Sequence, residues 1–134
     1  MIEWKYISPL KVGTEVEVLE LKYFNPVPAD LKDCIKQNNG GMPSMSKFDI
    51  GNKKEMVFGG LLSFNEGDDD SFYDFVGEFE TEDKTRLTMF PFGLDPFGNF
   101  YCIKENKVVF FDHESNAVLP IADSFTKFLE MLYA

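Results

Sequence analysis

Apolar positions recur with helical spacing in four parts of the chain, and residues three and four apart share one face of a helix. The predicted helices begin near residues 14, 28, 71 and 123. Their expected apolar stripes are Val12, Val16, Leu19 and Tyr23; Leu31, Cys34 and Ile35; Phe72, Phe75, Val76 and Phe79; and Phe125, Phe128, Leu129 and Leu132. Residues 14–21 also alternate in polarity, so a strand is the alternative there.

The predicted helix ends carry recognisable capping residues. Thr14 and Glu17 have the spacing of a capping box, and Ser71 is placed to cap the third helix. Pro28 suits a first turn, and the Asn-Asn-Gly-Gly run at 38–41 ends the second helix because these residues tolerate a left-handed conformation.

Short apolar runs between polar turns predict the strands. They lie at 56–64, 87–92, 100–103, 107–112 and 117–121, while 42–51 is expected to be a loop. Gly59 and Gly60 indicate a bulge or a close backbone approach, and Glu105 with Asn106 indicates a hairpin turn. The order of elements does not alternate as in a parallel α/β protein. The predicted class is α+β: a mainly antiparallel sheet with helices packed around it, in a single domain over 1–134.

Composition supports a folded, cytoplasmic chain. It has 134 residues, 44% of them hydrophobic and 15 of them Phe, which is ample for one core. The first ten residues, MIEWKYISPL, lack a signal-peptide pattern, and no apolar run is long enough to cross a membrane. Cys34 and Cys102 are expected to be buried free thiols.

Charge divides the chain in two. Residues 1–65 hold eight acids and eight bases, whereas 66–134 hold fifteen acids and five bases, so the net charge of −10 comes from the second part. Residues 66–83 contain nine carboxylates and no Lys or Arg. Such a surface repels nucleic acid and anionic membranes and attracts a basic partner. The alternative is a solvated face that only aids solubility.

No catalytic or metal-binding pattern emerges. His113 is the one histidine, which excludes a two-histidine zinc site. Its neighbours Asp112 and Glu114 point away from it in an extended segment, so the three side chains do not converge. The spacing after Asp68 does not fit a calcium loop. The glycine-rich turn at 93–98 leads into a strand, not into a phosphate-binding helix. We therefore expect no enzyme activity and no cofactor.

Three motifs, in order, resemble those of the Smi/Knr-like proteins, the SUKH superfamily. They are VPADL at 27–31 with NGGMP at 39–43; FGLDPFGNFYCI at 92–103; and VFFDHE at 109–114 with ADSFTKFL at 122–129. Together they span nearly the whole chain, but residues 66–86 match none of them.

The resemblance implies a cytoplasmic bacterial immunity protein that binds and neutralises a cognate toxin domain. Many such toxins are nucleases with basic substrate grooves, which fits an acidic inhibitor. The expected contacts are steering carboxylates and aromatic anchors: Glu66, Asp68, Asp69, Asp70, Asp74, Phe72 and Tyr73. The alternatives are a regulatory scaffold and a small-ligand sensor near Asn99 and Asp112. The oligomeric state is left open.

Overall fold

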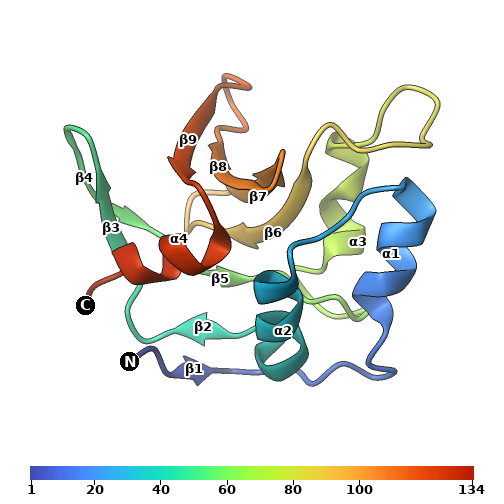
Figure 1. Cartoon of the computed structure of the whole chain (residues 1–134), viewed down its shortest axis with the longest axis horizontal. Helices are drawn as coiled ribbons and strands as arrows, with labels where there is room; N and C mark the ends of the chain where they lie inside the picture. Colours follow the sequence, from blue (N-terminus) through green and yellow to red (C-terminus); the bar gives the residue numbers. More distant parts are fainter.

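The computed structural model describes all 134 residues and contains four α-helices, one 3-10 helix and nine strands. Figure 1 shows α2 and α4 on the near side of the sheet and α1 and α3 beside one another at its right-hand end. The elements are β1 (Trp4–Lys5), α1 (Glu15–Tyr23), α2 (Ala29–Asn38), β2 (Met42–Pro43), β3 (Lys47–Ile50), β4 (Lys53–Val57), β5 (Gly60–Leu61), α3 (Phe72–Phe75), η1 (Val76–Glu78), β6 (Phe90–Leu94), β7 (Phe100–Lys104), β8 (Lys107–Phe111), β9 (Val118–Ala122) and α4 (Phe125–Met131).

The main sheet is antiparallel and follows chain order, β5-β6-β7-β8-β9. Glu105 and Asn106 both have positive φ, 53° and 65°, as a tight two-residue turn between β7 and β8 requires. Two smaller antiparallel pairs, β1-β2 and β3-β4, extend the structure. The predicted α+β class with an antiparallel sheet is confirmed.

The region between α2 and α3 differs from the prediction. Residues 42–51 form β2 and β3 instead of a loop, and the run 56–64 is not one strand. The chain leaves the β3–β4 hairpin after Val57 and joins the main sheet at Gly60, so Phe58 and Gly59 separate two strands. Hydrophobicity alone did not show the break, because the side chains on both sides of it are apolar.

Two predicted helix starts had different outcomes. Thr14 makes no capping hydrogen bond; instead the Glu15 carboxylate accepts the N–H groups of Val12 (2.8 Å) and Gly13 (2.7 Å), so the predicted box is wrong. Val12 is also exposed. Ser71, by contrast, caps the third helix as predicted and forms a capping box with Asp74. The α-helix it begins ends at Phe75, before the last residue of the predicted apolar stripe, Phe79, and continues as η1.

The core occupies both faces of the sheet. A cluster of 21 buried residues holds most of the aromatic rings, and Tyr101 and Ile103 of β7 belong to it. The alternate residues Phe100 and Cys102 point to the other face, where they join Phe79 in a cluster of five. The segment that follows α3 therefore covers the back of the sheet.

In the main cluster, edge-on ring contacts link distant elements. Phe58 lies edge-on to Tyr101 (5.3 Å between ring centroids) and to Phe128 of α4 (5.2 Å). The Tyr101 hydroxyl donates to the Val57 carbonyl (2.7 Å), which ties the β3–β4 hairpin to the sheet. None of the helices is long and apolar enough to cross a membrane.

Candidate functional site

The carboxylates of the acidic segment 66–83 fall into two groups, one bonded within the protein and one exposed. Four of its nine carboxylates accept hydrogen bonds within the protein: Asp68, Asp74, Glu80 and Asp83. The other five carboxylates (Glu66, Asp69, Asp70, Glu78 and Glu82) lie at exposed positions. The segment is thus partly a structural element and partly a free acidic surface.

Asp68 belongs to the structural group. Its Oδ2 accepts from Ser63 Oγ (2.7 Å), Ser8 Oγ (2.8 Å) and Asn65 Nδ2 (3.3 Å). These bonds, the one from Ser63 first, lower the pKa of the Asp68 carboxyl below its usual value. Asp68 therefore joins the N-terminal segment to the residues that follow β5, and it is a poor candidate for partner contact.

Asn39, the first residue of the NGGMP motif, lies in the same network. It is fully buried. Its Nδ2 donates to the Ser8 carbonyl (2.8 Å) and to Ser63 Oγ (3.1 Å), while its Oδ1 accepts the Phe64 N–H (2.8 Å). An amide is suited to this position because one side chain both donates and accepts.

The predicted aromatic anchors do not lie on the surface as expected. Phe72 is fully buried and stacks on Phe64 with 5.3 Å between ring centroids. Tyr73 is half-buried, and burial raises the pKa of its hydroxyl. The prediction of Phe72 as an exposed anchor is wrong, because the ring is the first inward position of the α3 stripe.

Asp69 and Asp70 line a groove, which we call the acidic groove. It has a volume of about 320 Å³. Asp95, from the turn after β6, supplies a third carboxylate, and no Lys or Arg lines the space. The lining consists of Tyr6, Gly40, Met42, Gly59, Gly60, Leu61, Ser63, Asp69, Asp70, Leu94, Asp95 and Pro96.

The groove depends on Gly59 and Gly60. A Cβ on Gly60 would lie 2.9 Å from the Gly41 carbonyl oxygen, and a Cβ on Gly59 would lie 3.0 Å from that of Leu94. These separations are too short for larger residues, so the predicted close backbone approach is confirmed. It brings the NGGMP motif, β5 and the turn after β6 to one place.

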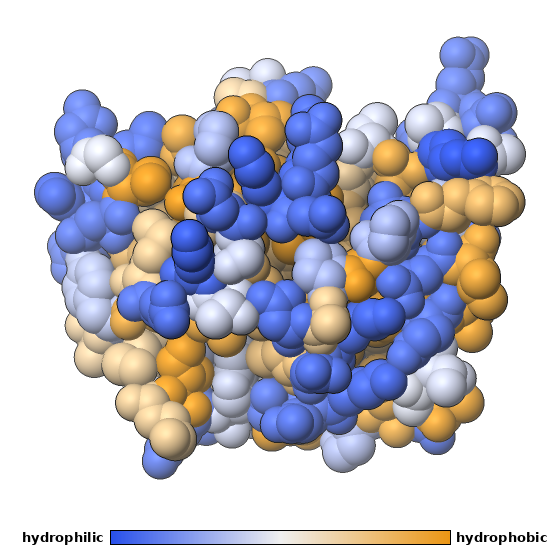
Figure 2. Space-filling model, viewed as in Figure 1, coloured by the Kyte–Doolittle hydropathy of each residue, from blue (hydrophilic) through white to orange (hydrophobic).

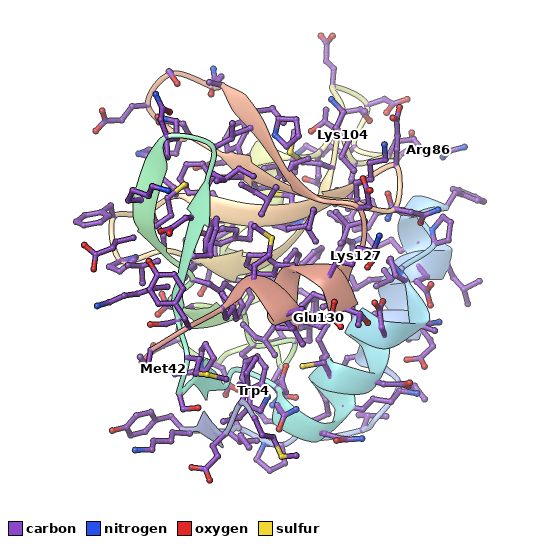
Figure 3. All side chains as sticks on the ribbon, turned by 60° about the vertical axis from the view of Figure 1, so that its left-hand side comes forward. Trp4, Met42, Arg86, Lys104, Lys127 and Glu130 are labelled. Atoms are coloured by element: carbon purple, nitrogen blue, oxygen red, sulfur yellow. The ribbon has the colours of Figure 1, made fainter.

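Two exposed side chains border the groove. The Tyr6 ring is 79% exposed and its backbone has φ of 60°, a conformation that bulky residues seldom adopt. Met42 is 49% exposed, and β1 pairs with β2 beside it, so Trp4 and Met42 lie together at one edge (Figure 3). Sequence reasoning missed both, since they lie outside every predicted helix and strand.

Asp95 was also missed as a site residue, although its turn was predicted. Its Oδ1 accepts the N–H groups of Phe97 and Asn99 (2.8 Å each), and its Oδ2 accepts from Asn99 Nδ2 (3.0 Å). These hydrogen bonds hold the Asp95 carboxylate in one orientation, and its negative charge contributes to the groove.

The residues of the alternative ligand site serve as turn supports. Asn99 Oδ1 accepts the His113 N–H (3.1 Å), and Asp112 Oδ1 accepts the Glu114 N–H (2.9 Å). No group of three or more His, Cys, Asp or Glu side chains is arranged to hold a metal ion. Asn99 thus supports the turn that holds Asp95, and Asp112 supports its own turn between β8 and β9.

Both cysteines are free, as expected, but only Cys102 is fully buried; Cys34 is half-buried. Burial raises the pKa of the Cys34 thiol to about 11 and that of Cys102 well above its usual value. Neither thiol is set up as a nucleophile.

Comparison with known proteins gives one match. The model of the SMI1 / KNR4 family (SUKH-1) matches residues 14–131, which includes all three motifs and most of the groove but not Tyr6. No curated protein and no solved structure matches the chain. The match covers far more than half of the chain, and the chain therefore belongs to the SMI1/KNR4 family (SUKH-1).

Proposed function

We propose that this protein is a cytoplasmic bacterial immunity protein, without enzyme activity, that binds and neutralises a cognate toxin domain. The observation that carries the proposal is the acidic groove, where carboxylates from residues 69, 70 and 95 meet beside exposed Tyr6 and Met42. The partner is a basic protein, and a nuclease domain fits best because its substrate groove is basic. Direct binding of nucleic acid or of a membrane is not part of this function.

Charge and apolar area have separate tasks in such a complex. Exposed carboxylates attract a basic surface over several ångströms and raise the association rate, by an effect that salt screens. Affinity comes mainly from a few large side chains that become buried on binding. Asp69 and Asp70 serve the first task, and Tyr6 and Met42 serve the second.

A small-ligand sensor is the second candidate, with the acidic groove in place of the site expected near Asn99 and Asp112, which do not line it. A volume of about 320 Å³ is at the lower limit for a small-molecule site. The exposed Tyr6 beside the groove favours a protein partner. A ligand that binds by shape would show little salt dependence, whereas a steered protein would lose association rate as salt rises.

The test starts from the coding context, where we expect a secreted protein with a basic C-terminal domain to be encoded next to this gene, and continues with co-expression of that domain and this chain. We expect protection of growth and a stable complex. Combined Asp69→Asn and Asp70→Asn should slow association about tenfold at low salt and much less at 0.5 M salt. Tyr6→Ala should mainly accelerate dissociation. Association is measured by stopped-flow fluorescence or surface plasmon resonance.

Glu114→Gln is the matched control, because this exposed carboxylate lies outside the groove. It should leave association unchanged. Absence of both protection and complex would refute the proposed function. If the changes at residues 6, 69 and 70 left the association and dissociation rates unaffected, the toxin would bind to a face other than the acidic groove.

A further inference from the structure

Asn39 is followed by Gly40, and such a pair of residues can react with itself. The glycine nitrogen attacks Cγ of the asparagine, because no Cβ on the glycine hinders its approach. The new N–Cγ bond closes a five-membered ring, the Cγ–Nδ2 bond breaks, and ammonia leaves with the proton of the Gly40 N–H. Water then opens the ring to aspartate or to isoaspartate. No other asparagine in the chain precedes a glycine.

In the native structure the backbone keeps the reacting atoms apart. Asn39 is the C-cap of α2 with φ −48° and ψ 128°, an extended conformation. Ring closure requires rotation about ψ until the Gly40 nitrogen lies next to Cβ of Asn39. The Asn39 carbonyl turns with that rotation, yet it accepts the Ser8 N–H (2.8 Å), and the Gly41 N–H donates to the Asn38 carbonyl (2.8 Å). Two backbone hydrogen bonds therefore oppose the reactive conformation.

The Asn39 side chain is fixed as well. Figure 2 shows mainly hydrophilic residues over α2, so solvent reaches the outer side of this helix. Asn39 lies one residue beyond the helix and is fully buried. Both the nitrogen and the oxygen of its amide are hydrogen-bonded, to Ser8, Ser63 and Phe64. Attack on Cγ would break these bonds inside the protein, which disfavours the reaction in the folded chain.

The products of the reaction do not fit this position. An aspartate would bring acceptor oxygens to the place where Nδ2 now donates to the Ser8 carbonyl and to Ser63 Oγ. The Ser63 hydroxyl cannot donate to both, because it already donates to Asp68 (2.7 Å). The new carboxylate would thus share Ser63 with Asp68 in a buried site, where an uncompensated charge is strongly destabilising. Isoaspartate, in addition, lengthens the backbone of the turn by one carbon atom.

We propose that Asn39 and Gly40 form a deamidation site that the fold protects. The reaction takes place when the chain unfolds and the pair becomes free to rotate, and its products do not return to the native structure. Unfolding thereby becomes irreversible, at a rate set by the fraction of unfolded chain. The reaction needs no enzyme, and the site is independent of the proposed toxin binding.

The test compares deamidation of the purified full chain in mildly alkaline buffer and in the same buffer with concentrated guanidinium chloride. Peptide mass spectrometry measures the conversion of Asn39 from amide to acid. We expect a rate at least about a hundredfold higher in the unfolded chain, since the native chain reacts only from its rare open states. Asn116 is the internal reference, because it is exposed in the native protein and precedes alanine. Its rate should change much less.

Two glycine variants show whether unfolding of the whole chain exposes the site. A Cβ on Gly93 would lie 2.5 Å from Phe58 Cε1, whereas a Cβ on Gly77 meets no atom within 4 Å. Gly93→Ala should raise the rate at Asn39 in buffer by the same factor as it raises the unfolded fraction, and Gly77→Ala should not raise it. A destabilised Gly93→Ala chain that reacts at the rate of the parent would overturn the proposal, because local opening of the turn would then be sufficient.

Asn39→Asp supplies one of the two products directly, and Asn116→Asp is its matched control. The change at residue 39 should lower the yield of refolding by about tenfold or more, whereas the change at residue 116 should leave it at the value of the parent. Circular dichroism after dilution from guanidinium chloride measures the yield. Equal rates of deamidation at Asn39 in the folded and the unfolded parent would refute the proposal, as would an Asn39→Asp chain that refolds like the parent.

Discussion

Asp68 and Asp69 are neighbours with the same side chain and different roles. Asp68 accepts three side-chain hydrogen bonds, whereas Asp69 is exposed and lines the groove. The sequence shows three aspartates in a row and cannot separate them. The difference arises from Ser8 and Ser63, which the fold brings to Asp68 alone.

Asp68→Asn should lower the urea midpoint of unfolding at pH 7. The pKa of native Asp68 lies below its usual value of 3.8, so ionised Asp68 adds stability above the unfolded-state pKa. That stability is lost as the pH falls through the lower, native pKa. The midpoints of the variant and the parent should therefore converge below pH 3.8. Urea unfolding followed by circular dichroism at pH 7 and at acid pH measures both effects.

Asp69→Asn is the matched control and should leave the midpoint at pH 7 unchanged, because its carboxylate accepts no hydrogen bond in the protein. Equal midpoints for the parent and Asp68→Asn at pH 7 would contradict the structural role of Asp68.

Among the elements, helices and hairpins were predicted better than strand ends. α2, α4 and the β7–β8 turn lie where periodicity and turn residues indicated, because their main bonds are local. The break between β4 and β5 was missed because it depends on which strand each half pairs with. The capping of α1 was misassigned for a similar reason: Glu15 folds back onto the preceding turn.

At the element level, Gly93→Ala should destabilise the pairing of β5 with β6. A Cβ on Gly93 would lie 2.5 Å from Phe58 Cε1 and 2.9 Å from the Gly60 carbonyl oxygen. Overpacking of this kind costs about 1–3 kcal/mol of the free energy of unfolding. Chemical denaturation of the parent and the variant measures the loss.

Gly77→Ala provides the comparison. No atom lies within 4 Å of a Cβ at Gly77, and its φ is not positive. Alanine there should be neutral or add up to about 1 kcal/mol, since it restricts the unfolded chain. Similar stabilities for the two variants would mean that β5 and β6 are less closely packed than described.

In the whole molecule, one large cluster connects the elements. It draws buried residues from α1, α2, α3, α4 and the strands of the main sheet, and Trp4 of β1 packs against it. The family match over 14–131 spans the same elements. This arrangement predicts that the chain unfolds as one unit.

Thermal or urea unfolding should accordingly give coincident curves by Trp4 fluorescence and by far-ultraviolet circular dichroism. The fluorescence reports the N-terminal β1–β2 pair, because Trp4 is the one tryptophan. The circular dichroism reports the helices and sheet. Two separate midpoints would show that the N-terminal segment, and with it the Tyr6 side of the groove, unfolds independently.

The sequence by itself determined the α+β class, most helix positions, the β7–β8 hairpin, the Ser71 cap and the net charge of −10. These follow from local spacing, local hydrogen bonds and composition. Only the tertiary structure decided which carboxylates are free and where the groove lies. Its lining comes from residues 6, 40, 42, 59–61, 63, 69–70 and 94–96. Such a site requires packing between segments distant along the chain, and no local pattern records which distant segments will meet.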